Sequence, residues 1–394
     1  MYLLNTIKTL LSRSGILGLN FLLVIITSRL WGAEGRGIIS ILMADLAIIV
    51  VINNVFTGSS VAFYTPAVNF QKLMKSAYVW VFAFSIAGAL FFSLFLGHAN
   101  FLYLAVLTVI TSLSTFNLSV LIGKEKLSLY NLYSLLLPLL TLVLIIASKY
   151  LFPSASVYMY FGAYGIAYGL IWLLGLIHLK PSSALRQAFD LSLAKKIFTY
   201  GYKNELSYFL QFLNYRLSYF ILLYYMGLNK VGLFSLGIAV AESVWILSKS
   251  LSLVLYSKLI NTKDAESTKG QTNLMALISG VGTLLIGLVV IFIPEAWFVK
   301  VFGPDFATAK SIVLWLYPGI LFVAVANIYG HYMAATNQMR PLILKSAFGL
   351  VVTVVFSYYL IPSYGIVGAC ITTTCSHVVS SVYIFWAIKF RESV

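Results

Sequence analysis

Apolar segments long enough to cross a bilayer recur from one end of this 394-residue chain to the other. Each runs to about 20 residues, the length of helix that a hydrocarbon core of about 30 Å requires. Hydrophobic residues make up 61% of the sequence and charged residues only 9%, so a soluble globule would lack polar surface. The pattern therefore predicts an all-α polytopic membrane protein.

Apolar length and polar breaks predict about 12 transmembrane helices in two sets of six. The spans are expected at 9–31, 37–58, 76–97, 101–123, 128–150 and 156–178, then at 205–226, 231–256, 273–293, 309–333, 341–361 and 364–387. The corresponding domains are an N-terminal six-helix bundle over 1–180 and a C-terminal six-helix bundle over 205–394.

The longest polar connection, 181–204, joins the two predicted bundles. Apolar residues at four-residue spacing, among them Phe189, Leu193 and Ile197, alternate there with basic side chains. Such a segment is typical of an amphipathic helix that lies on a membrane surface. We expect this connector to lie on the cytoplasmic leaflet.

The net charge of +15 would suggest a nucleic-acid partner in a soluble protein, but membrane topology explains it here. If both termini face the cytoplasm, 18 of the 26 Lys and Arg residues fall in cytoplasmic segments and 6 fall in external segments. The other two lie within spans. This asymmetry predicts a multi-pass plasma-membrane protein with both termini cytoplasmic. The two cysteines and four histidines show no spacing typical of a metal site.

The two halves of the sequence echo each other. Gly32 and Gly37 follow the first predicted span, and Gly227 and Gly232 follow the seventh with the same spacing. A second echo relates 150–154 to 359–363. Parallel repeats of this kind are typical of two-lobed transporters, and the glycines would permit a tight reversal between adjacent spans.

Few ionisable residues lie inside the predicted spans, and each is costly there unless it is paired or solvated. Arg216 lies roughly 16 Å along its helix from Gly227, and Glu242 lies roughly 15 Å from Gly232, so both are placed near the middle of the membrane. Arg216 could bind an anionic pyrophosphate or sugar, with Glu242 titrating in the transport cycle. The alternative is a structural ion pair between neighbouring helices.

Three further residues are candidates, each with a structural alternative. Lys249, seven residues beyond Glu242, could receive an anion on the same helix face or extend to the interface. Arg29 could line a cavity or anchor a span at the interface. Asp45 could bind a proton or cation or form a hydrogen bond between helices. Glu205, near the expected cytoplasmic end of its span, is predicted to be solvated.

The stretch 214–235, followed by Ala241 and Glu242, resembles the seventh and eighth helices of bacterial polysaccharide flippases. These transporters of O-antigen and related repeat units belong to the multidrug/oligosaccharidyl-lipid/polysaccharide exporter superfamily. Matches at 29–37, 121–126, 302–306 and 361–369 extend the resemblance over nearly the full chain. Relatives often carry an acid two positions after the arginine, where this sequence has Ser218.

The resemblance implies two six-helix bundles around a central cavity and transport by alternating access. The implied cargo is an undecaprenyl-pyrophosphate-linked oligosaccharide, carried across the inner membrane for surface polysaccharide or lipopolysaccharide biosynthesis. Proton or sodium coupling, a monomeric state, and contacts with membrane lipids and polysaccharide assembly proteins are expected. No cofactor or nucleic acid is expected.

Four other functions were weighed. A multidrug exporter of the same superfamily would need an anionic or aromatic cavity for cationic drugs, which Arg216 and Lys249 oppose. A lipid II flippase shares the pyrophosphate carrier and is the nearer alternative. A membrane enzyme would be expected to carry paired carboxylates or a large extramembrane loop. A non-transporting scaffold of a glycan assembly complex would have no need of charges within its spans.

Overall fold

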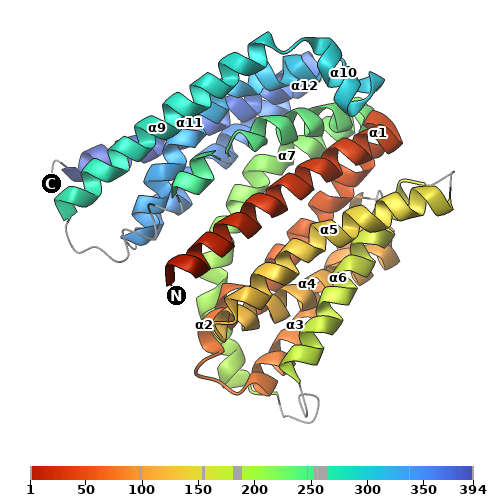
Figure 1. Ribbon diagram of the computed structural model, residues 1–394, viewed down its shortest axis with the longest axis vertical. Coiled ribbons are helices and arrows are strands. Elements are labelled where there is room, and N and C mark those ends of the chain that lie inside the picture. Colours follow the sequence, from red (N-terminus) through yellow and green to blue (C-terminus); the bar gives the residue numbers. More distant parts are fainter. Residues whose placement is uncertain are drawn as a thin grey trace. The chain divides into compact units, whose positions relative to one another are not determined.

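The computed structural model describes residues 2–96, 100–152, 156–180, 189–245, 247–252, 255, 265–336 and 338–392. Helices dominate this part of the chain (Figure 1). The long helices are α1 (Tyr2–Thr57), α3 (Phe70–Phe91), α4 (Phe101–Gly123), α5 (Leu127–Leu151), α6 (Tyr158–Leu179), α7 (Leu191–Ser243), α9 (Ala265–Phe292), α11 (Ala309–Ala335) and α12 (Met339–Glu392). Short elements are α2 (Ser59–Tyr64), a π-helical segment (Phe92–Leu96), α10 (Glu295–Phe302) and a 3₁₀ turn (Pro304–Phe306).

Nine helices in the described residues are long and apolar enough to cross a membrane. Three of them are broken once, at Gly32, Gly227 and Gly365, where φ is 62°, 76° and 55°. Residues other than glycine rarely adopt such backbone angles. The nine helices thereby supply twelve apolar segments, which confirms the predicted all-α polytopic fold.

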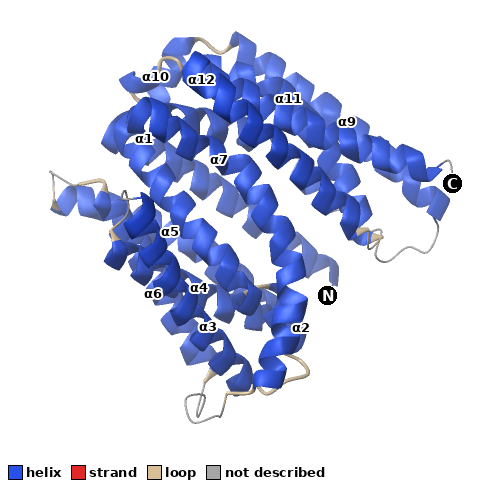
Figure 2. Ribbon diagram, turned by 180° about the vertical axis from the view of Figure 1, so that it is seen from behind, coloured by secondary structure: helices blue, strands red, loops and turns tan. Residues whose placement is uncertain are grey.

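The chain forms two compact units. Unit 1 comprises Met1–Leu23 and Leu42–Phe209, and unit 2 comprises Val24–Ile41 and Leu210–Val394. This division differs from the predicted bundles, because 24–41 belongs with the C-terminal half of the chain. In unit 2, α9, α11 and α12 lie side by side (Figure 2).

Unit 1 has an apolar core with polar contacts inside it. Phe116, Val120 and Ile171 are fully buried where α4 and α6 meet their neighbours. The amide of Asn53 on α1 donates to Ser85 Oγ on α3 and to Ser112 Oγ on α4, both at 2.9 Å. These side-chain bonds link three helices where apolar contact alone would be less specific.

The second part of the predicted connector is the beginning of α7. Leu193, Ala194 and Ile197 are buried in the core of unit 1, so this apolar face packs against protein. Residues 181–188 of the connector lie outside the described residues. Phe189, just before α7, is exposed.

Asp190 begins α7 as its N-cap. Its carboxylate accepts hydrogen bonds from Leu193 N at 3.1 Å and Ser192 Oγ at 2.8 Å, and it forms an ion pair with Lys72 at 3.2 Å. These donors, the backbone N–H first among them, lower the pKa of Asp190 to about 2. The interactions stabilise the start of the helix by satisfying its unpaired donors.

The predicted glycine echo corresponds to a reciprocal contact inside unit 2. A Cβ atom at Gly37 would collide with the carbonyl oxygen of Leu228, and one at Gly232 would collide with that of Ala33. Ala33 and Gly37 follow the break at Gly32 at the same intervals as Leu228 and Gly232 follow the break at Gly227. The equivalent segments of the two repeats therefore cross with their backbones in contact. In the second echo, Pro153 and Ser154 lie outside the described residues.

We expect Gly232→Ala to destabilise the protein and Gly162→Ala to stabilise it slightly. At Gly232 the added methyl meets backbone, and overpacking of this kind costs about 1–3 kcal/mol. At Gly162, within α6, no neighbour lies within 4 Å, so the substitution gains about 0.5–1 kcal/mol of helix stability. Thermal unfolding in detergent measures both, and equal effects of the two substitutions would contradict the assigned crossing.

The lowered pKa of Asp190 predicts how Asp190→Asn depends on pH. A carboxylate with a folded pKa of about 2 stabilises the protein fully above its unfolded value of about 3.9 and loses that effect as the pH falls towards 2. The melting temperature of the variant should therefore be lower than that of the wild type by a constant amount from pH 7 to 5. The difference should shrink in more acidic buffers. A difference that grows as the pH falls would contradict this assignment.

Candidate functional site

Arg216 and Glu242 form an ion pair in unit 2. Arg216 Nη2 lies 3.3 Å from Glu242 Oε2, and Nη1 donates to the hydroxyl of Tyr219 at 2.8 Å. The guanidinium also lies 5.2 Å from the centroid of the Tyr219 ring. The structure thus brings together the two residues that the sequence placed at equal depth on neighbouring segments.

The break at Gly227 explains why the two charges meet. Arg216 precedes this glycine by three helical turns, and Glu242 follows it by about four, so the two arms of α7 place them at similar distances from the reversal. Tyr219, one turn from Arg216, is 4% exposed and packs edge-on against Phe234 with ring centroids 5.7 Å apart. Its hydroxyl is thereby held where the guanidinium can reach it.

The ion pair remains partly accessible. The Arg216 side chain is 27% exposed and the Glu242 side chain 26%. A guanidinium carries five N–H donors in a planar fork, more than one carboxylate oxygen and one phenol can accept. Arg216 can therefore accept a further anionic group while it stays paired, or exchange Glu242 for it.

A second arginine of unit 2 follows the break at Gly32. Arg36 donates from Nη1 to Thr27 Oγ1 at 3.3 Å. Arg36 was not among the candidate residues predicted from the sequence. Its position in the sequence could have identified it. Arg36 lies between Gly32 and Gly37, and the internal repeat matches this segment to the one between Gly227 and Gly232.

Lys249 lies beyond the end of α7. α7 ends at Ser243 and Val244 lies in a turn, so the seven-residue spacing from Glu242 does not run along one uninterrupted helix. The Lys249 ammonium lies 5.6 Å from the centroid of the Trp245 ring, an arrangement that stabilises a cation. Its side chain is exposed.

Arg29 binds the end of a helix in unit 2. Its guanidinium donates to the carbonyl oxygens of Lys300 and Val301, the latter at 2.7 Å. These carbonyls belong to the last turn of α10, where helices leave acceptors unpaired and favour a positive charge. Nearby, Asp305 accepts the backbone N–H of Ala33 at 3.0 Å. The two contacts fasten 24–41 to the rest of unit 2.

Asp45 and Glu205 are both buried in unit 1. Asp45 is fully buried in the second part of α1. Glu205 is 7% exposed, with its carboxylate next to Gly58 at the break between α1 and α2. The prediction that Glu205 is solvated is therefore wrong, because the chain bends at Gly58 and covers it.

Ser218, at the position where relatives often carry an acid, pairs with another hydroxyl. Its Oγ lies 3.3 Å from Ser357 Oγ on α12. The side chain is 2% exposed. A carboxylate at this position would lie against the hydroxyl of Ser357.

No group of three or more potential metal ligands occurs among the described residues.

Comparison with solved structures identifies this fold among membrane transporters. The similar structures include transporters of the MATE family and of the MOP superfamily, the superfamily that the sequence motifs resemble. They match 98–99% of this chain. This chain therefore shares the fold of these membrane transporters.

Three of these structures illustrate the likeness. The lipid II flippase MurJ, in an inward closed conformation, matches with a TM-score of 0.74 and 14% identity, over 98% of this chain and 87% of that one. A mutant of the MATE transporter VcmN from Vibrio cholerae has a TM-score of 0.64 and 14% identity, over 99% and 95%. A MOP superfamily transporter from Pyrococcus furiosus has 0.63 and 16%, over 98% and 94%. Neither a family model nor a curated protein sequence matches this chain.

We expect Glu242→Gln to cost roughly 1–3 kcal/mol of stability, between the values typical of exposed and fully buried ion pairs. The loss arises because Arg216 keeps its charge without a carboxylate. Adding Arg216→Met should restore part of it, since no unpaired charge then remains. A double-mutant cycle measured by chemical denaturation in mixed micelles tests this, and strictly additive effects would show that the pair contributes no coupling.

Proposed function

We propose that this protein is a flippase that moves undecaprenyl-pyrophosphate-linked oligosaccharide repeat units from the cytoplasmic leaflet to the outer leaflet of the plasma membrane. The observation that carries the proposal is Arg216: a guanidinium in the middle of a predicted span, held by Glu242 at 3.3 Å and still 27% exposed. Its planar donor fork suits a phosphate oxygen pair.

The balance of charge around Arg216 favours an anionic cargo. Arg216 is paired with Glu242, yet its guanidinium stays 27% exposed and has more donors than its two partners can accept. It can bind a pyrophosphate oxygen, which a cationic drug does not offer. The similarity to the lipid II flippase MurJ supports the fold required for such a cargo.

In the proposed cycle, Arg216 binds the anionic head group and Glu242 exchanges between Arg216 and a proton. Arg29 and Lys249 are assigned subsidiary binding roles, although Arg29 already binds α10 and Lys249 lies against Trp245. Asp45, buried in unit 1, is assigned to proton or sodium coupling. Alternating access would carry the head group across while the lipid tail stays in the bilayer.

The proposal extends to topology and partners. Both termini are assigned to the cytoplasm on the excess of basic residues in the corresponding segments. The protein would act as a monomer and would meet polysaccharide assembly proteins that supply or use the repeat unit. A lipid II flippase, a multidrug exporter and a non-transporting scaffold are the competing functions.

Complementation tests the proposal. In a bacterial strain that lacks its own repeat-unit flippase, the wild-type protein should restore surface glycan. Arg216→Ala should reduce it by about tenfold or more, as expected for the loss of a charged hydrogen bond of ~1.5–3 kcal/mol. Arg216→Lys should be impaired nearly as much, because lysine lacks the planar fork. Membrane abundance must be matched, and Arg340→Ala, at an exposed position of α12, is the control.

Other results would redirect the assignment. Full activity of Arg216→Lys would leave only a requirement for charge. Failure of the wild type in several glycan backgrounds would contradict the repeat-unit cargo. Rescue of a strain depleted of its lipid II flippase, or resistance to cationic drugs, would then identify the competing transport function. The absence of both effects would favour the non-transporting scaffold.

A further inference from the structure

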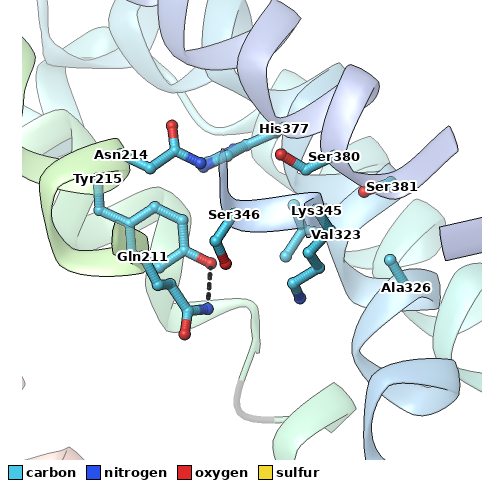
Figure 3. Close-up of a pocket in the computed structure, with 10 residues that line it drawn as sticks. All are labelled: Gln211, Asn214, Tyr215, Val323, Ala326, Lys345, Ser346, His377, Ser380 and Ser381. Atoms are coloured by element: carbon cyan, nitrogen blue, oxygen red, sulfur yellow. Dashed lines mark hydrogen bonds between the residues drawn. The ribbon is translucent and has the colours of Figure 1, made fainter. Parts of the chain in front are cut away.

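A small cavity inside unit 2 lies among α7, α11 and α12. Its volume is about 20 Å³, enough for one water molecule or one monatomic ion. Figure 3 shows Gln211 and Tyr215 of α7 on one side of this cavity and Lys345 and Ser346 of α12 on the other. None of its lining residues is a carboxylic acid.

Lys345 places a positive charge at the cavity. α12 begins at Met339 and carries Lys345 into an apolar helix. No ion pair or hydrogen bond of Lys345 occurs in the part of the chain that the structure describes. A cation inside a membrane-spanning unit requires a counter-charge or several polar contacts.

His377, from the second part of α12, adds buried polar atoms without partners. Its side chain is 4% exposed, and neither ring nitrogen has a hydrogen-bond partner among the described residues. The edges of the ring are confined by Tyr215 and Trp245, whose centroids lie 5.4 and 5.7 Å away. Unpaired nitrogens at a buried site are costly and indicate a missing ligand.

Two side chains of α7 present donors to the cavity, whereas the hydroxyls of Ser346 and Ser380 donate to backbone carbonyls and offer only acceptors there. The amide oxygen of Asn214 already accepts the hydroxyls of Thr353, at 2.6 Å, and Ser376. Its NH₂ group therefore remains to donate. The hydroxyl of Tyr215 accepts from Gln211 at 3.0 Å, so its own O–H is available.

The charges beyond the lining do not neutralise the site. Glu242, the acid of the neighbouring ion pair, is already bound to Arg216 at 3.3 Å. The uncompensated positive charge of Lys345 disfavours a metal cation at this site. A water molecule would fill the volume and satisfy some donors, yet it would leave the charge of Lys345 uncompensated.

We propose that this cavity binds one small monovalent anion, for which chloride is the probe, between the Lys345 ammonium and the His377 ring. The anion would accept hydrogen bonds from the side chains of both halves of α12 and from Asn214 or Tyr215 of α7. It would thus connect α7, which carries Arg216, to α12. This site is separate from the Arg216–Glu242 pair, and its occupancy does not depend on the identity of the transported cargo.

The test is the melting temperature of the purified full-length protein in detergent, in sodium chloride and in sodium gluconate at equal ionic strength. The wild type should melt higher in chloride, with a saturable dose dependence and a shift of about 2–4 °C. Lys345→Met should lose the chloride response and should melt in gluconate at or above the wild-type temperature, because an unpaired charge has been removed. Lys389→Met, an exposed lysine of the same helix, should keep the response.

Two outcomes would overturn the proposal: equal melting of the wild type in both salts, or an unchanged chloride response in Lys345→Met. If Lys345→Met does not fold, wild-type crystals soaked in sodium bromide decide the matter. An anomalous peak in this cavity beside Lys345 Nζ supports the site, and peaks elsewhere without one here refute it. Both measurements read anion binding directly, so failure of glycan complementation would leave their result unaffected.

Discussion

Unit 2 depends on a place where two backbones touch with no side chain between them. Gly37 lies against the carbonyl of Leu228, and Gly232 lies against that of Ala33. Attraction between apolar side chains gives little preference for one partner over another in lipid, so close backbone contact at small residues is what makes a crossing specific. The crossing holds 24–41 in unit 2 and orders the reversal at Gly227. The pairing of Arg216 with Glu242 follows from that reversal.

Each charge near a span is accommodated in a different way. Arg216 has a carboxylate and a phenol, Arg29 has the free carbonyls at the end of α10, and Lys249 has an indole ring. These solutions differ in what they leave available. The two carbonyls fix Arg29 at the end of α10, whereas the partners of Arg216 are side chains, one of which, Glu242, can be exchanged for a ligand. Lys345 differs from all three, because it has no ion-pair or hydrogen-bond partner among the described residues.

The sequence predicted what local chemistry determines. Apolar length marks helices, and a glycine followed five residues later by another marks a reversal, so the twelve segments and the meeting of Arg216 with Glu242 could be derived. Contacts between distant segments could not. The capping of α10 by Arg29 joins residues 271 and 272 positions apart, and Glu205 is buried by a bend at Gly58. The end of α7 at Ser243 could not be predicted either, because no glycine or proline marks it in the sequence.

The assignment of 24–41 to unit 2 has a consequence for how the protein is made. A chain synthesised from its N-terminus inserts this segment long before residues 210–394 exist, and domains ordinarily fold in the order of synthesis. Here segment 24–41 stays in the membrane without its unit 2 partners, and Gly37 has no contact with Leu228, until the second repeat has been inserted. Unit 2 can therefore close only after most of the chain has been translated, and a cut between residues 209 and 210 would leave the C-terminal fragment without a part of its own structure.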